Sequence, residues 1–181
     1  MSHENVRAAW RKLTQSRQLV RVPGVYDGLS ARIAQQVGFG AVAFSGNAVS
    51  ASLLGMPDVG MLDMSENLAH VGRIARQLDI PVICDADTGY GGVLNVVRTV
   101  QEFEAAGIAA IHIEDQVTPK RCGLLPQGIP VVSQEEHAQK IRAAVQARRS
   151  PDFWIIARTD AKSMHGLEEA TRRGRAYVEA G

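Results

Sequence analysis

Aromatic side chains and cysteines are scarce in this sequence, and neither sign of charge predominates. Phe, Trp and Tyr make up 5% of the 181 residues, which argues against a surface that stacks nucleic-acid bases. The 20 basic and 19 acidic residues almost cancel, so no basic stripe suggests a nucleic-acid partner. The two cysteines, Cys84 and Cys122, lie far apart without metal-type spacing and do not indicate a disulfide scaffold.

Long apolar runs are absent as well. No run approaches the ~20 residues of a membrane span, and the polar N-terminal segment MSHENVRAAWRKL has no apolar core of a signal peptide. We therefore expect a soluble, cytoplasmic protein with no membrane partner.

What the sequence does contain is an alternation of strand-like and helical segments. With 45% hydrophobic residues, it can form one domain over residues 1–181. An N-terminal helix is expected at about 4–17, followed by a βαβα order, which is typical of parallel strands covered by helices. The expected strands are 19–22, 41–45, 82–85, 109–114 and 153–158, and the expected helices lie near 28–37, 65–78, 93–106, 134–148 and 167–180.

Polar residues end nearly every expected strand. The endings are FSGN at 44–47, CDADTG at 84–89, HIEDQ at 112–116 and ARTDA at 157–161. One such ending is ordinary loop chemistry, but four in succession favour a shared pocket, because the carboxyl ends of parallel strands meet on one side. We count about five βα units where a (β/α)₈ barrel has eight and ~250 residues, so we expect a shortened α/β barrel of the TIM type.

Two carboxylates follow the third expected strand. Alternation along a strand makes Asp85 and Asp87 face the same way, roughly 7 Å apart. At an effective dielectric near 20 they repel by about 2 kcal/mol, which a divalent cation reverses. Oxygen ligands without Cys or His suit Mg²⁺, with Mn²⁺ as an alternative, and Glu114 and Asp58 can complete the shell directly or through water. A solvated loop with hydrogen-bonding aspartates, and for Asp58 a simple turn, are the alternatives.

The segment from about 115 to 133 shows neither helical nor strand periodicity, which is typical of a gating loop. Lys120 and Arg121 immediately precede Cys122, a setting that lowers a thiol pKa. A thiol on such a loop can exchange a proton with a substrate. The alternative is a surface cysteine beside solvated cations.

Taken together, these motifs resemble the isocitrate lyase/phosphoenolpyruvate mutase superfamily. The resemblance runs from about residue 20 to the end and rests on FSGN, GMPDVG, CDADTGYGG, HIEDQVTPKRCG and ARTDA, which stand in the family's order and spacing. Within the family the chain looks most like the 2-methylisocitrate and dimethylmalate lyases. The resemblance implies an α/β barrel, Mg²⁺ bound near Asp85, and metal-bound waters held by Asp58, Asp87 and Glu114. It also implies a homo-oligomer, usually a tetramer, in which partner subunits exchange the last barrel helix.

The same resemblance implies a Mg²⁺-dependent carbon–carbon lyase. Its substrate would be a small 2-hydroxy di- or tricarboxylate, cleaved to an α-oxo acid and a carboxylate. The KRCG motif marks the lyase branch, in which Cys122 protonates the enolate beside Lys120 and Arg121. The substrate-binding residues that it implies are Ser45, Gly46, Asn47, Asp58, Gly123 and Arg158.

Some readings stay open. Arg158 could instead be a structural partner of Asp160 or Glu114. His112 is expected behind the site or in the core, with a role as proton carrier as the alternative, and Cys84 is expected in the core. The lyases carry a histidine at position 124 and, in methylisocitrate lyase, a tyrosine at position 43, where this chain has Leu124 and Ala43. A smaller substrate, oxaloacetate decarboxylation, carboxyphosphonoenolpyruvate mutase-type activity and a non-catalytic binding or assembly fragment therefore remain alternatives.

Overall fold

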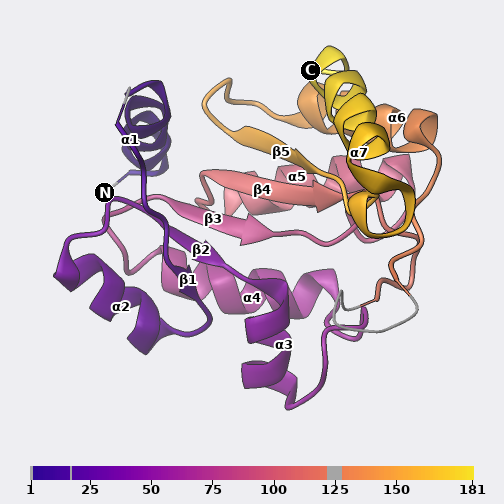
Figure 1. Ribbon diagram of the computed structural model, residues 1–181. Helices are drawn as coiled ribbons and strands as arrows, with labels where there is room; N and C mark the ends of the chain where they lie inside the picture. The colour runs from indigo at the N-terminus through magenta and orange to yellow at the C-terminus, as the bar shows by residue number, and fades with distance from the viewer. Residues whose placement is uncertain (1, 17, 122–127) are drawn as a thin grey trace.

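Five parallel strands lie side by side in chain order at the centre of the structure (Figure 1). The structure is a computed structural model that describes residues 2–16, 18–121 and 128–181. The strands are β1 (Gly24–Val25), β2 (Val42–Phe44), β3 (Val82–Asp85), β4 (Ala110–Glu114) and β5 (Trp154–Arg158). The α/β class and the parallel sheet predicted from the sequence are confirmed.

Helices connect the strands and cover the sheet. They are α1 (His3–Gln15), α2 (Gly28–Val37), α3 (Gly46–Leu54), α4 (Met64–Ala75), α5 (Val93–Ala105), α6 (Gln134–Ala147) and α7 (Lys162–Glu179). Neighbouring helices α4 to α7 contact one another in sequence, as the strands beneath them do. Sequential strand order with one row of helices is the wall of a barrel, whereas a doubly wound fold reverses its strand order midway.

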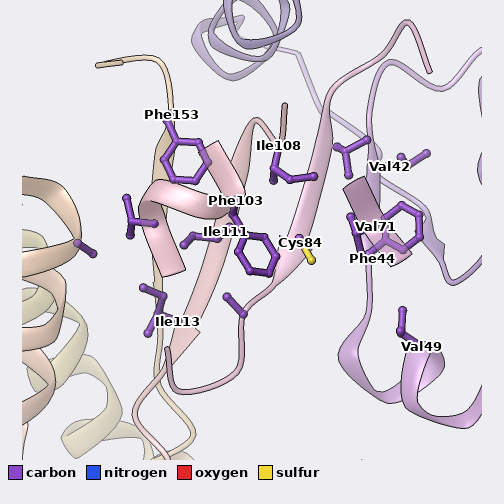
Figure 2. Close-up of a cluster of buried hydrophobic side chains, with 14 of the residues drawn as sticks. Val42, Phe44, Val49, Val71, Cys84, Phe103, Ile108, Ile111, Ile113 and Phe153 are labelled. Carbon is purple, nitrogen blue, oxygen red and sulfur yellow. The ribbon is translucent and has the colours of Figure 1, made fainter. Parts of the chain in front are cut away.

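The helix-covered face of the sheet holds the main hydrophobic core (Figure 2). Alternate strand residues such as Phe44, Cys84 and Ile111 point to this face and pack with Val71 of α4 and Phe103 of α5. Each is at most 2% exposed, and burying such a side chain contributes roughly 1.5–3 kcal/mol. The predicted core position of Cys84 is confirmed.

The other face of the sheet is divided along the strand direction. Near the amino ends, Trp10 of α1 packs edge-on against Trp154 with ring centroids 6.0 Å apart, in a cluster with Ile83 and Ala110. Because side chains alternate along each strand, the residues two and four positions beyond these face the same side. That rule leaves polar side chains at the carboxyl ends of the same face, where the candidate site lies.

Several element boundaries differ from the prediction. The strand expected at 19–22 is wrong: the strand is β1, where the Pro23 carbonyl accepts a hydrogen bond from the Ala43 amide at 3.0 Å. No helix is predicted between 46 and 54, yet α3 lies there, with Ser45 as its N-cap and Gly55 as its left-handed C-cap. Helix α7 begins five residues earlier than expected, although Gly166 interrupts it.

Among the helices of residues 2–16, 18–121 and 128–181, none combines the length and the apolar character needed to cross a membrane.

Candidate active site

The carboxyl ends of β3, β4 and β5 bring the predicted polar residues to one edge. Strand register pairs Asp85 with His112 and Glu114 with Arg158. Past the end of β3 the strand alternation stops, because Asp87 adopts a left-handed conformation with φ 50°. Asp87 nevertheless stays beside its neighbours: its amide donates to Asp85 Oδ1 at 3.0 Å and its carbonyl accepts from the Glu114 amide at 2.8 Å.

Lys120 is the centre of this cluster. Its ammonium Nζ lies 3.0 Å from Asp58 Oδ1 and 3.8 Å from Glu114 Oε1, and it forms a short ion pair with Asp87. The Lys120 side chain is only 3% exposed, and those of Asp58 and Asp87 are 15% and 13% exposed. The sequence predicted these residues near the site but not that Lys120 lies among the carboxylates.

Burial and charge together set the protonation of the cluster. Burial raises the pKa of Glu114 to about 8, with a further contribution from Asp85, against the effects of Lys120 and Arg158. Burial also raises the pKa of Asp87 to about 6, although Lys120 acts in the opposite direction. For Lys120, burial lowers the pKa, but Asp85, Asp87 and Glu114 together outweigh it, and the pKa is raised. The four carboxyl groups Asp58, Asp85, Asp87 and Glu114 thus outnumber the two cations Lys120 and Arg158.

Arg158 is the second cation of the site, on the side of Glu114 and Asp160. Its Nη1 lies 3.0 Å from Glu114 Oε2, and its Nη2 lies 3.1 Å from Asp160 Oδ1. Both structural partners that the sequence left open are therefore present. Because the Arg158 side chain is still 43% exposed, it keeps donors free for a carboxylate from solution.

The N-terminus of α3 faces Asp85. The Gly46 amide donates to Asp85 Oδ2 at 3.3 Å, while the Ser45 hydroxyl accepts from the Ala48 amide at 3.5 Å. A Cβ at Gly46 would lie 2.9 Å from Asp85 Oδ2 and 3.3 Å from Lys120 Nζ, so only glycine allows this approach. Asn47 is exposed in the first turn of the helix.

The carboxylates of the cluster are suitable ligands for a divalent cation that keeps several of its waters. In the part of the chain that the structure describes, no three His, Cys, Asp or Glu side chains are grouped so as to ligate one ion. Both oxygens of Glu114 are buried, and among the described residues they have ion-pair contacts with Lys120 and Arg158 but no hydrogen bond of good geometry. The other candidate ligand atoms nearby are carboxylate oxygens. Mg²⁺ commonly keeps several waters and uses one or two carboxylates. The carboxylates at this edge therefore suit a hard ion that keeps much of its hydration.

The segment expected to gate the site is paired at its two ends. Gln116 forms an antiparallel bridge with Val131, and the Val117 amide donates to the Pro130 carbonyl at 3.0 Å. The Arg121 side chain is exposed, and the Arg121 amide donates to Gln116 Oε1 at 2.9 Å. The predicted Cys122 and Gly123, with the substituted Leu124, lie outside the described residues.

Two supporting residues were not predicted. Asn67 of α4 donates to the Asp85 carbonyl at 3.0 Å and to the Tyr90 hydroxyl at 2.8 Å, which fixes the end of β3. Asp115 is fully buried and accepts from the Tyr177 hydroxyl at 2.8 Å and from Arg173 Nη1 at 3.1 Å. For Asp115, the sequence signal was its place directly after Glu114 in HIEDQ, as a second acidic residue at the end of a buried strand.

His112 is half-buried on the same face as Asp85, and burial lowers its pKa.

A cavity of about 370 Å³ opens beside the cluster, between the start of α4 and the start of α5. Asp87 and Lys120 line it together with Arg98, so the cluster is accessible from that side.

Comparison with known proteins places this architecture in a family. Residues 10–181 match the family model described as phosphoenolpyruvate phosphomutase. The chain is 49% identical over 177 residues to 2,3-dimethylmalate lyase of Eubacterium barkeri, covering 98% of this chain and 61% of that protein. It is 50% identical over 171 residues to 2-methylisocitrate lyase of Aeropyrum pernix, covering 94% of this chain and 54% of that protein. The chain therefore belongs to the phosphoenolpyruvate mutase/isocitrate lyase superfamily, and it spans somewhat more than half the length of these relatives.

Solved structures give the same placement. The chain matches oxaloacetate acetylhydrolase in complex with 3,3-difluorooxalacetate with a TM-score of 0.90 and 41% identity, covering 99% of this chain and 60% of that one. It matches phosphonopyruvate hydrolase in complex with oxalate and Mg²⁺ with a TM-score of 0.85 and 38% identity, at 99% and 60% coverage. The predicted family and barrel-type fold are confirmed.

Proposed function

We propose that this chain carries the active site of a Mg²⁺-dependent carbon–carbon lyase that cleaves a 2-hydroxy di- or tricarboxylate to an α-oxo acid and a carboxylate. The observation that carries the proposal is the excess of buried carboxylate around Lys120 at the carboxyl edge of the sheet. A hard dication balances that charge, and the complex of phosphonopyruvate hydrolase with oxalate and Mg²⁺ supports the choice of ion. The names of the two lyase relatives support the substrate class, with 2-methylisocitrate and 2,3-dimethylmalate as the first candidates.

The residues of the site divide the work between binding and charge control. Arg158 offers a planar pair of donors to a substrate carboxylate, and Asp160 and Glu114 hold the guanidinium in place. The N-terminus of α3, with Ser45, Gly46 and Asn47, adds a positive dipole end for the oxo-acid fragment. A bound Mg²⁺ supplies Lewis acidity and a template for the hydroxyl and carboxylate groups.

Proton movement completes the reaction. The hydroxyl proton leaves to a base as the C–C bond breaks, and the electron pair of that bond passes to the second fragment, which becomes a carboxylate enolate. We assign the proton that quenches this enolate to the Cys122 thiol, with Lys120 and Arg121 as the neighbouring cations that stabilise the thiolate. Gly123 and Asp58 belong to the same substrate-binding set.

The test is a product screen with 2-methylisocitrate, 2,3-dimethylmalate and oxaloacetate, run on the wild-type chain and on Cys122→Ser. We expect α-oxo acid from the wild type, and loss of turnover in Cys122→Ser without loss of Mg²⁺-dependent ligand binding. Full activity of Cys122→Ser would remove the thiol from the mechanism. Serine preserves the size of the side chain, so a folding defect is not expected.

Oxaloacetate is a second candidate substrate. Ala43 lies half-buried on the site face of β2 and offers no hydrogen bond to a third carboxylate, and the likeness to oxaloacetate acetylhydrolase favours a four-carbon dianion. With oxaloacetate as the only substrate, oxalate and acetate would identify hydrolysis of the C–C bond, and pyruvate and CO₂ would identify decarboxylation.

A homo-oligomer, by resemblance a tetramer, is part of the same proposal. Leu29, Ile33 and Val37 are exposed at four-residue spacing along α2, and such an apolar stripe commonly marks an association surface. Size-exclusion chromatography with light scattering measures the assembly directly.

A further inference from the structure

The side chain of Gln116 bridges two parts of the site. It is 3% exposed, and both ends of its amide are used. Oε1 accepts from the Arg121 amide at 2.9 Å, and Nε2 donates to Asp160 Oδ2 at 2.8 Å. The other oxygen of Asp160 accepts from Arg158 Nη2 at 3.1 Å and from Arg158 Nε at 3.3 Å. One continuous chain of hydrogen bonds thus runs from the backbone at Arg121 to the guanidinium of Arg158.

The direction of every bond in this chain is fixed. A backbone amide can only donate, and so can a guanidinium, so the groups between them must accept at both outer ends. Gln116 meets the first requirement with its carbonyl oxygen, and Asp160 meets the second with a carboxylate oxygen. The inner bond then needs one donor, which the Gln116 amide nitrogen supplies. Replacing either residue alone by its acid or amide counterpart leaves two acceptors or two donors facing each other.

We infer that Gln116 is a positioning residue that holds the Lys120–Arg121 segment in register with Arg158 through Asp160. The two cations Lys120 and Arg158 come from segments nearly 40 positions apart in the sequence, and both contact Glu114. The bracket formed by the buried Gln116 and the partly buried Asp160 adds a second link between these segments. The expected effect of Gln116 on substrate binding rests on the proposed function. The hydrogen bonds that link Arg121, Gln116, Asp160 and Arg158 do not depend on it.

A charge swap tests the bracket. In Gln116→Glu a carboxylate faces Asp160, and in Asp160→Asn an amide nitrogen faces either the Gln116 amide or Arg158. In the double variant Gln116→Glu/Asp160→Asn, the new asparagine donates inward and still accepts from Arg158, while the new glutamate accepts from the Arg121 amide. The double variant therefore restores every bond with the same net charge.

The first measurement is hydrogen exchange of the Arg121 amide by NMR on the full chain. We expect exchange roughly five- to tenfold faster in each single variant, because the like groups that face each other displace the side chain at position 116 and weaken its hydrogen bond to the Arg121 amide. In the double variant we expect a return to within about twofold of wild type. Asp152→Asn, at the remote surface pair with Arg11, is the matched control and leaves this amide unchanged. Unchanged exchange in the single variants, or exchange in the double variant as fast as in the singles, overturns the inference.

The second measurement is the affinity for oxalate in the presence of Mg²⁺, by calorimetry, with thermal unfolding of each variant alongside. Positioning predicts weaker oxalate binding in both single variants and recovery in the double variant, even where their unfolding temperatures match. Loss of affinity that follows the unfolding temperature alone, without recovery, overturns the role in positioning. If the wild type binds no oxalate, the proposed function fails, while the exchange measurement still decides the bracket.

Discussion

Arg158 and Glu114 form an ion pair across neighbouring strands, with Arg158 Nη1 3.0 Å from Glu114 Oε2. The two side chains differ sharply in exposure, 43% for Arg158 and 1% for Glu114. The buried carboxylate thus anchors a guanidinium whose outer edge remains available. An anchored cation loses little side-chain entropy when it binds a carboxylate.

Replacing Arg158 tests whether this outer edge binds substrate. We expect Arg158→Lys to raise KM by about tenfold or more, because lysine keeps the charge but loses the bidentate geometry. Steady-state kinetics on the substrate found in the product screen separates KM from kcat. An unchanged KM in Arg158→Lys contradicts a direct carboxylate contact.

Gly46 controls how closely α3 approaches the carboxylates. In Gly46→Ala the new Cβ would meet Asp85 Oδ2 at 2.9 Å, so we expect Mg²⁺ affinity to fall by about tenfold. The stability change stays within about 1 kcal/mol, because alanine is a better helix former than glycine. Gly174→Ala in α7 is the matched control, since nothing lies within 4 Å of its added Cβ. Calorimetric Mg²⁺ titration checks the prediction, and equal affinity in both variants contradicts it.

Asp115 is a buried carboxylate that links the end of β4 to Arg173 and Tyr177 of α7. Asp115→Asn leaves the Arg173 guanidinium, 8% exposed, without its buried counter-charge, so we expect a loss of about 3 kcal/mol in the free energy of unfolding. Asp152→Asn breaks an exposed pair with Arg11 and should cost less than about 1 kcal/mol. Urea denaturation of the two variants measures the contrast. Similar losses in both would contradict a structural role for Asp115.

His137 makes stability depend on pH. Burial lowers its pKa to about 4, against the effect of Asp115 and together with those of Lys140 and Arg173. The unfolded chain, with an ordinary histidine pKa near 6.5, binds the proton more readily, so stability falls as the pH drops from about 6.5 to about 4. The loss at this one residue is on the order of 3 kcal/mol.

Denaturation curves across that pH range measure the effect. His137→Phe keeps a ring against Tyr177, which lies 4.5 Å away between centroids, and should flatten the pH dependence in this window. An equally steep dependence in His137→Phe would assign the effect to other groups.

The sequence predicted those features that depend on local pattern. Strand alternation placed Cys84 in the core, and the parallel order placed Asp85, Glu114 and Arg158 at one edge. The strand expected at 19–22 is wrong because Leu19, although it begins an apolar run, is 88% exposed and unpaired with β2. The position of a strand depends on its hydrogen bonds to neighbouring strands, and these cannot be derived from the local sequence alone.

Long-range polar contacts could not be predicted. Lys120 reaches Asp58 and Glu114 across segments that no local pattern relates, and Gln116 meets Asp160 in the same way. Helix α3 could have been predicted from the sequence, because Ser45 and Gly55 are ordinary cap residues at its two ends. The FSGN motif is expected only as a polar strand ending, so no helix is expected there.

Mg²⁺ binding by isothermal titration calorimetry, wild type against Asp85→Asn, tests the central claim most directly. We predict one ion per chain for the wild type, affinity weakened by about 100-fold in Asp85→Asn, and no change in Asp152→Asn. Equal affinity in wild type and Asp85→Asn, or no binding by the folded wild type, would contradict a dication held by these carboxylates.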